Sequence, residues 1–204
     1  SVVFVIVVED EEAAASGAKK KPAAAFAAVA GVALVAGAAA NMEEGDATTD
    51  ATATDAGDGD GSADAVVSAG NTGALMAMSK LQLRTMTGVT RPAIAAFFPT
   101  VGELLCMLDL GANIECDAEN LVQFAILGQA FHRSLTGKES PRLGLLNVGE
   151  EQQKGHEYLR DAARQLSDTE LGINYQGFVE GSDLVNGQLD VVVTDGFSGN
   201  IALK

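Results

Sequence analysis

The feature that most constrains the fold is a unit that recurs between residues 64 and 204. Each copy has a short apolar strand, then a loop of small polar residues, then a helical pattern. The expected strands are 64–68, 104–110, 142–147 and 189–194, with a further short strand over 173–178. They are nearly continuous in apolar residues, which is typical of parallel strands covered on both faces. The sequence therefore predicts an α/β fold with a mostly parallel sheet and helices on both faces.

The loops that follow the expected strands are rich in Gly, Asn and Asp. They cover residues 70–73, 109–113, 147–150 and 195–200. Parallel strands bring such loops to one edge of the sheet, where α/β proteins bind ligands. Glycine permits close backbone approach, and unpartnered amides at a helix start attract anions such as phosphate. The same residue types also form ordinary turns and helix caps, so both interpretations stay open on the residues alone.

The chain divides by composition into three expected regions. Residues 1–40 are apolar and form a partial N-terminal strand and helix region, whereas residues 41–63 form an acidic low-complexity linker and residues 64–204 the α/β core. Residues 23–40 are eighteen uncharged residues, eleven of them Ala, behind a basic flank. That pattern fits a signal peptide or a membrane span. A buried Ala-rich helix and strand is favoured because Ala drives membrane insertion only weakly.

Charge and cysteine content exclude several function classes. The chain has 13 basic and 28 acidic residues, for a formal charge of −15. Nucleic-acid binding is not expected, because binding phosphates along a strand requires a basic surface. The two cysteines, Cys106 and Cys116, have no zinc-site spacing and indicate a reducing compartment. No metal or cofactor site is expected.

Common catalytic fingerprints are absent from the sequence. There is no G-x-G-x-x-G after a strand, no G-x-x-x-x-G-K-[ST] and no G-x-S-x-G. The two histidines, His132 and His156, are interpreted as ordinary helix residues, and Cys106 as a core residue.

A local excess of positive charge lies in the acid-free segment 65–102. It consists of Lys80, Arg84 and Arg91, the first two spaced to share a helix face. The simple interpretation is a solvated helix face. The alternative is a docking patch for an acidic partner, since opposite charge speeds encounter with a chain that is otherwise anionic.

Five blocks occur in an order that resembles the PlsX family of phosphate acyltransferases: SAGNTGALMA, LDLGANIECDAENLVQFA, PRLGLLNVGEEQQKG, INYQGFVEGSDL and DVVVTDGFSGNIALK. The resemblance runs from about Asp64 to Lys204. It implies transfer of a fatty acyl group from acyl carrier protein to inorganic phosphate for phospholipid synthesis. It also implies a Rossmann-like fold similar to phosphate acetyltransferases and isocitrate dehydrogenase, and a cytoplasmic homodimer with peripheral contact at the inner face of the plasma membrane.

The chain departs from the family pattern in three places. The family's opening strand is not found, residues 13–63 match poorly, and the family continues beyond Lys204. An incomplete fold, truncated at both ends, is therefore expected.

For the reaction that the resemblance implies, residues in the loops are assigned roles as a hypothesis, from their type and spacing. Phosphate is expected to be bound by Gly70, Asn71, Thr72, Gly73, Gly199 and Asn200. Lys204, one helical turn after Asn200, would supply a cation, and Asn113 would donate to the acyl carbonyl. Asp109 and Asp195 would orient donors, with Gly111 in support, and Glu150 would pair with Lys154.

Two rival functions stay open on the sequence. Asp109, Glu150 and Asp195 would suit a Mg²⁺ site in a phosphoryl-handling enzyme. Alternatively, the chain would be an inactive fragment or module that binds acyl carrier protein through Lys80, Arg84 and Arg91.

Overall fold

The computed structural model describes residues 2–8, 32–38, 67, 68, 76, 77, 80, 85, 88–168 and 172–204. The chain forms two compact units, Ser1–Ile94 and Ala95–Lys204. This division falls later than residue 64, where the composition changes. The expected linker over 41–63 lies outside the described residues, so it stays a prediction.

The first unit contains three short strands. They are β1 (Val2–Val8), β2 (Val32–Ala38) and β3 (Val67–Ser68). β1 pairs antiparallel with β2, with Val5 opposite Val35, and β2 pairs parallel with β3. The strand expected within the Ala-rich segment is therefore β2, whereas residues 23–31 lie outside the described residues. In the part of the chain that the structure describes, no helix is long and apolar enough to cross a bilayer.

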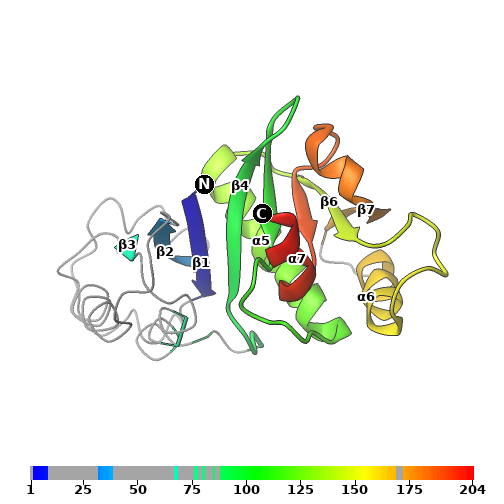
Figure 1. Cartoon of the computed structure of the whole chain (residues 1–204), viewed down its shortest axis with the longest axis horizontal. Helices are drawn as coiled ribbons and strands as arrows, with labels where there is room; N and C mark the ends of the chain where they lie inside the picture. The colour runs from blue at the N-terminus through cyan, green and yellow to red at the C-terminus, as the bar shows by residue number, and fades with distance from the viewer. Residues whose placement is uncertain are drawn as a thin grey trace. The chain divides into compact units, whose positions relative to one another are not determined.

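The second unit is built on a five-stranded sheet with the order β4-β5-β8-β6-β7 (Figure 1). The strands are β4 (Ala93–Pro99), β5 (Leu104–Leu108), β6 (Arg142–Leu146), β7 (Asn174–Val179) and β8 (Val191–Val193). β5, β8, β6 and β7 run parallel, which confirms the predicted mostly parallel sheet. β4 was not predicted from the sequence pattern, and it pairs antiparallel with β5.

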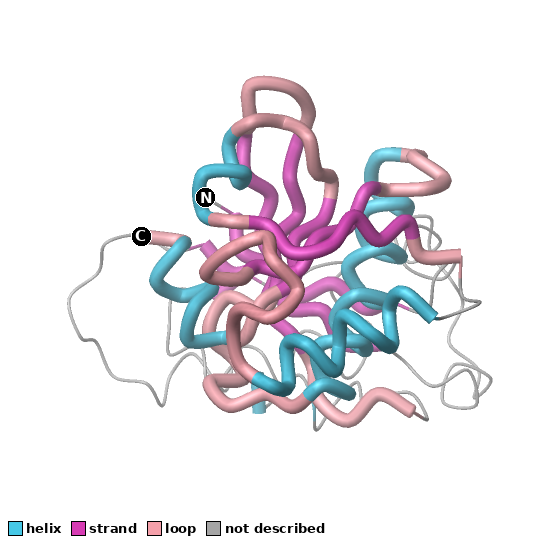
Figure 2. The backbone as a smooth tube through the Cα atoms, turned by 90° about the vertical axis from the view of Figure 1, so that its right-hand side faces the viewer, coloured by secondary structure: helices cyan, strands magenta, loops and turns pink. Residues whose placement is uncertain are grey.

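Helices cover both faces of this sheet. They are α5 (Ala118–Thr136), α6 (Glu157–Asp168) and α7 (Gly196–Ala202), with a 3₁₀ helix, η1, at Gly181–Val185. α5 packs against α6, and Figures 1 and 2 show α7 on the opposite side of the sheet from α5. The predicted α/β class is confirmed.

Two helices begin at other residues than the sequence pattern predicts. The third helix was expected from Glu151, but α6 begins at Glu157, because the preceding chain turns through Gly155 at a φ of 82°. The last helix was expected after Asn200, but α7 begins at Gly196. Asp195 caps it, its side chain accepting a hydrogen bond from the backbone N–H of Ser198.

The core lies between the sheet and α5. Leu108 and Val191 of the strands are buried on this face of the sheet, as are Leu121 and Phe124 of α5. Close approach of the helix to the sheet requires Gly128, since a Cβ there would lie 2.7 Å from Leu108 and 2.8 Å from Val191.

Two residues expected to be structural are buried in this core. Burial raises the pKa of the Cys106 thiol well above its usual range, so the thiol stays protonated, as expected of a core cysteine. His132 is likewise buried in α5, where its Nδ1 lies 3.1 Å from Thr136 Oγ1.

Candidate functional site

Three of the predicted loops lie at the carboxyl edge of the parallel strands, after β5, β6 and β8. Two of them are joined directly. The backbone N–H of Gly196 donates to the carbonyl of Asn113 at 2.7 Å, and Asn200 Nδ2 donates to the carbonyl of Leu110 at 3.3 Å. The structure therefore brings residues 109–113 and 195–200 together, as the parallel topology predicts.

Asp109 organises the loop after β5. Its buried carboxylate accepts hydrogen bonds from the backbone N–H of Ala112 at 3.1 Å and of Asn113 at 2.6 Å. The side-chain Nδ2 of Asn113 donates to the same carboxylate at 2.9 Å. Asp109 thus fixes the orientation of the Asn113 amide.

Asp195 organises the start of α7 in a similar way. Its Oδ1 accepts the Ser198 N–H at 2.8 Å, and its Oδ2 accepts the Ser198 hydroxyl at 2.9 Å. Tyr158, in the first turn of α6, donates its hydroxyl to the same Oδ2 at 3.4 Å. Burial and the nearby Asp195 charge raise the pKa of Tyr158 to about 12, so its phenol stays neutral and remains a donor. Asp195 therefore links the loop after β8 to α6.

Sequence reasoning did not single out Tyr158 or Ser198 as site residues. Ser198 stands three residues after Asp195, which is the spacing of a helix cap and would have indicated its contact with that carboxylate. Tyr158 carries no motif. Only its place near the start of an expected helix, beside the loop edge, could have pointed to it.

Glycines in α7 allow the helix to lie directly on the loop after β5. A Cβ at Gly199 would lie 1.9 Å from the Asp109 carbonyl oxygen, and one at Gly196 would lie 2.7 Å from the Asn113 carbonyl oxygen. Gly111 has a φ of 130° and faces Asn200. These glycines are therefore required for packing, whatever they also contribute to binding.

The backbone amides of these loops are largely used within the protein. Those of Ala112, Asn113 and Ser198 donate to Asp109 or Asp195, and that of Gly196 donates to Asn113. These four N–H groups are therefore used as in ordinary turns and helix caps.

Lys204 lies beyond the helix that was expected to carry it. α7 ends at Ala202, and Lys204 is exposed, with its backbone N–H donating to Ile201. Asn200 has its side-chain amide on Leu110.

The predicted pair between Glu150 and Lys154 is wrong. Lys154 pairs instead with Glu151, at 2.7 Å between Nζ and Oε2. The expected spacing of one helical turn does not apply, because this segment precedes the start of α6. The pair raises the pKa of Lys154 and lowers that of Glu151, chiefly through their hydrogen bond.

Several predicted residues cannot be placed. Gly70, Asn71, Thr72, Gly73 and Arg84 lie outside the described residues. Lys80 and Arg91 are exposed, and Lys80 Nζ lies 3.5 Å from the carbonyl oxygen of Thr90. The docking patch therefore stays a prediction.

The suggested Mg²⁺ site would require Asp109, Glu150 and Asp195 to converge. Within the described ranges, no group of three His, Cys, Asp or Glu side chains is placed to bind a metal ion. The carboxylates of Asp109 and Asp195 instead accept hydrogen bonds from amides and hydroxyls of their own loops.

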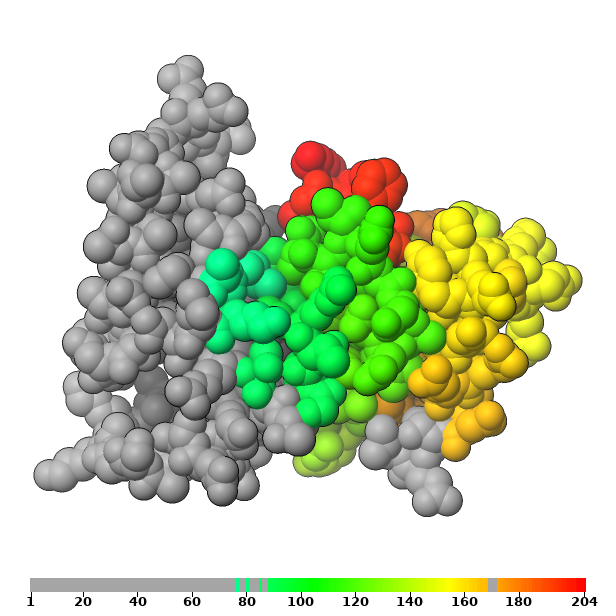
Figure 3. All heavy atoms as spheres, turned by 90° about the horizontal axis from the view of Figure 1, so that it is seen from below, coloured from blue at the N-terminus to red at the C-terminus, as the bar shows by residue number. Residues whose placement is uncertain are grey.

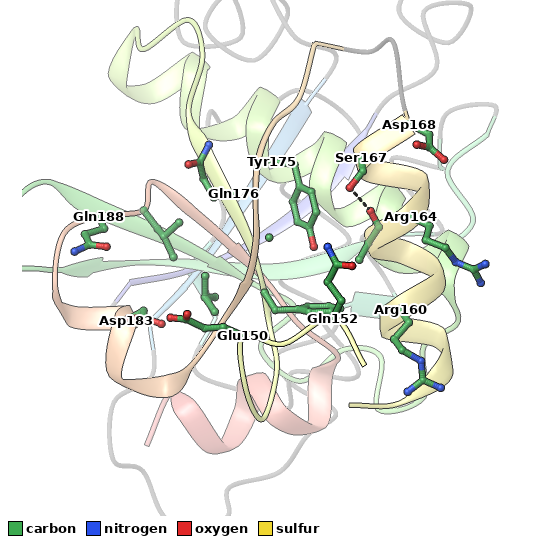
Figure 4. A pocket seen from close by; sticks show the side chains of 15 residues that line it. Glu150, Gln152, Arg160, Arg164, Ser167, Asp168, Tyr175, Gln176, Asp183 and Gln188 are labelled. Atoms are coloured by element: carbon green, nitrogen blue, oxygen red, sulfur yellow. Dashed lines mark hydrogen bonds between the residues drawn. The ribbon is translucent and has the colours of Figure 1, made fainter. Parts of the chain in front are cut away.

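A hollow of about 1070 Å³ lies beside α6, β7 and η1 (Figure 4). Of the predicted site residues that the structure describes, Glu150 is the one that lines it. In Figure 3, the loop between β6 and α6 and the start of α6 (yellow) form a different part of the surface from α7 (red). No sequence pattern predicts this hollow, because its walls come from segments that share no motif.

The structure is a mostly parallel α/β sheet with polar loops gathered at its carboxyl edge, which is the edge where α/β proteins bind ligands. The sequence profile of the family described as "Fatty acid synthesis protein" matches residues 7–204. The chain belongs to this family, which confirms the resemblance stated from its motifs.

Curated relatives extend this match. The phosphate acyltransferase of Rhodospirillum centenum is 61% identical over 144 residues, which cover 71% of this chain and 41% of the relative. The phosphate acyltransferase of Erythrobacter litoralis is 64% identical over 146 residues, again covering 71% of this chain and 41% of the relative. The chain thus spans about two fifths of the length of these relatives.

Proposed function

We propose that the protein transfers a fatty acyl group from acyl carrier protein to inorganic phosphate, forming an acyl phosphate for phospholipid synthesis. The observation that carries this proposal is the identity of 61% and 64% to proteins named phosphate acyltransferase. The joined loops after β5 and β8 supply an organised polar edge at the place where an α/β fold binds its ligand.

The proposed reaction needs no nucleophile from the protein. A phosphate oxygen attacks the thioester carbonyl, a C–O bond forms, the C–S bond breaks, and the carrier thiolate leaves and takes up a proton. The protein must position both reactants and stabilise the developing oxyanion. Asn113, oriented by Asp109, is proposed to donate to that oxyanion. Asp195 is proposed to orient the Ser198 hydroxyl beside it.

Phosphate binding is proposed for the loop at Gly70, Asn71, Thr72 and Gly73, together with Gly199 and Asn200. Lys204 would add a positive charge. Gly111 would keep the loop after β5 close to Asn200, against which it packs.

The partner protein and the location are proposed on the resemblance, and the docking surface on its charge. Acyl carrier protein would dock on Lys80, Arg84 and Arg91, whose charge opposes that of an acidic partner. The protein would act as a homodimer in the cytoplasm, with peripheral contact at the inner face of the plasma membrane.

The test is release of carrier thiol in the presence and absence of phosphate. Because the chain spans only part of its relatives, the assay uses a chimera. In it, the aligned 144 residues of this chain replace those of the Rhodospirillum centenum protein. We expect phosphate-dependent thiol release that persists in excess EDTA. Asn71→Ala and Lys204→Ala should each lower the rate by about 10²-fold, the typical cost of losing one such donor. A chimera that folds but releases no thiol with phosphate would contradict the proposal.

A further inference from the structure

The hollow beside α6 has polar walls and an apolar floor. The floor is formed by Phe178, Val179 and Leu189, all buried. One wall is a single face of α6, on which Arg160, Ala163 and Ser167 follow one another at helical spacing. Such a surface suits a ligand with both apolar segments and hydrogen-bonding groups.

The charged groups around the hollow do not favour binding of an anion. Three carboxylates, those of Glu150, Asp168 and Asp183, line it against two guanidinium groups, those of Arg160 and Arg164. Both guanidinium groups already have partners, since Arg160 donates to the Gly155 carbonyl at 2.7 Å and Arg164 pairs with Asp161. An uncharged ligand fits this lining better than a phosphate or a free carboxylate does.

Tyr175 provides a polar group that is buried at this site without a partner. Among the described residues, its hydroxyl is the one buried side-chain polar atom that makes no hydrogen bond. Figure 4 shows this hydroxyl directed into the hollow. Burial raises the pKa of Tyr175 above its ordinary range, so at neutral pH the group is an O–H donor. An unsatisfied buried hydroxyl destabilises the protein, and a ligand atom that accepts a hydrogen bond from it would remove that penalty.

Side-chain amides stand nearby. Gln152 and Gln188 line the hollow, and both side chains are exposed. An amide side chain both donates and accepts, so it pairs well with another amide. The complementary ligand is therefore an uncharged chain that carries amide groups.

The hollow reaches the carboxyl edge of the sheet. Glu150 and Gln152 belong to the loop after β6, and Val179 is the last residue of β7. β7 lies two strands from β8 in the sheet order, which is about 10 Å at the usual strand spacing. A chain of three peptide-sized units extends about 10 Å. A ligand of this length would span the distance from β7, which lines the hollow, to β8, the strand that Asp195 follows.

We propose that this hollow binds the uncharged, two-amide pantetheine arm through which a carrier protein holds its thioester, with the Tyr175 hydroxyl donating to an arm carbonyl. The inference rests on the proposed function, and it assigns that function a second binding region beside the loops after β5 and β8.

Binding is tested first on the whole 204-residue chain, with pantetheine as the probe and without any turnover. The chain has no Trp and two Tyr, so the Tyr158→Phe variant leaves Tyr175 as its one tyrosine fluorophore. We expect a saturable change in its fluorescence on titration. By calorimetry, Tyr175→Phe should weaken binding about threefold to tenfold, the usual range for one hydrogen bond.

A matched pair of α6 variants separates filling of the hollow from general damage. Ala163→Phe places a ring on the lining face and should abolish pantetheine binding, whereas Gln165→Phe, on an exposed position outside the hollow, should not. Absence of saturable binding to the unaltered chain, or equal binding by Ala163→Phe, would overturn the inference.

The activity assay distinguishes failure of this inference from failure of the proposed function. In the chimera, Ala163→Phe should raise KM for the carrier thioester at least tenfold and leave KM for phosphate unchanged. If the chimera is active but Ala163→Phe leaves its KM for the carrier thioester unchanged, the pantetheine site in the hollow is overturned and the proposed function is not. A chimera without phosphate-dependent release overturns the proposed function, while pantetheine binding by the chain still decides the hollow.

Discussion

Two aspartates stand at opposite ends of the same short strand and show how their surroundings decide their roles. Asp190 precedes β8 and is fully buried. It accepts hydrogen bonds from Lys138 Nζ at 2.9 Å and from the Arg142 backbone N–H at 2.7 Å. Asp195 follows β8 and is almost as buried, but its partners in the structure are the uncharged donors of Ser198 and Tyr158.

The difference lies in the balance of charge. Burial alone would raise the pKa of Asp190, but hydrogen bonds from Arg142 and Lys138 outweigh it and hold the pKa well below its usual range. That group anchors the start of β8 to the start of β6. At the other end, hydrogen bonds fix the position of Asp195, and no cation in the described part of the chain forms an ion pair with it. The amino end of the strand is thus stabilised by an ion-paired cluster, whereas the carboxyl end is the edge where we propose that the ligand binds.

The largest expected effect comes from breaking the amino-end cluster. Asp190→Ala should lower the free energy of unfolding by about 3 kcal/mol, because it removes the hydrogen bonds that a buried carboxylate accepts from two charged groups, Lys138 and Arg142. Urea denaturation measures this. Glu103→Gln is the control, since its carboxylate is exposed and its ion pair with Lys138 should contribute less than about 1 kcal/mol. Equal losses in the two variants would contradict the assignment.

At the carboxyl end, the next largest effect should come from Gly199→Ala. The added Cβ would collide with the Asp109 carbonyl and push α7 off the loop after β5. We expect a loss of about 2 kcal/mol in stability and a larger proportional loss of thiol release. Gly181→Ala is the matched control, since its Cβ would have no neighbour within 4 Å. A Gly199→Ala protein with unchanged activity would show that the contact does not support the site.

Acid should weaken the amino end in two stages. Burial lowers the pKa of His132, while nearby Asp190 opposes that shift. Below about pH 6.5, His132 becomes protonated in the unfolded state but stays neutral in the folded state. Protonation therefore favours unfolding, and the free energy of unfolding should fall. Asp190 has a lowered pKa, so its contribution persists above about pH 4 and is lost as pH falls through its folded value.

Denaturation midpoints between pH 7.5 and 3 check this prediction. His132→Gln should remove the first stage, and Asp190→Asn should remove the second. A first stage that persists in His132→Gln would assign it to another group.

The fold could be predicted largely because its strands carry a strong local signal. Val191–Val193 and Leu104–Leu108 are continuous apolar runs, and the capping pair of Asp117 and Asn120 marks the start of α5. β4 escaped prediction because its residues 93–99 return by a hairpin instead of starting a strand–loop–helix unit. The start of α6 was misplaced because Gly155 interrupts an otherwise helical pattern.

The site was predicted only at the level of its loops. Topology brings 109–113 and 195–200 together, and that follows from parallel strands alone. Which groups meet depends on side-chain packing: Lys154 selects Glu151 over Glu150, and Tyr158 reaches Asp195 from another helix. No local spacing encodes such contacts. The hollow beside α6 is invisible in the sequence for the same reason.

The smallest expected effects test the contact between Tyr158 and Asp195. At 3.4 Å the hydrogen bond is long, so Tyr158→Phe should cost less than about 1 kcal/mol of stability, measured by urea denaturation. If Tyr158→Phe lowered the free energy of unfolding as much as Asp190→Ala does, the two ends of β8 would not differ in their contribution to stability.

Titration of Tyr158 gives a finer measure of the same contact. Burial and the Asp195 charge raise its pKa to about 12, so Asp195→Asn should lower that pKa toward the ordinary value of 10.0 without reaching it, because burial remains. Tyrosinate absorbance in a Tyr175→Phe background reports Tyr158 alone, since the chain has two Tyr. Asp190→Asn should leave the titration unchanged. If both substitutions shift it equally, the charge that acts on Tyr158 is not local to the carboxyl end.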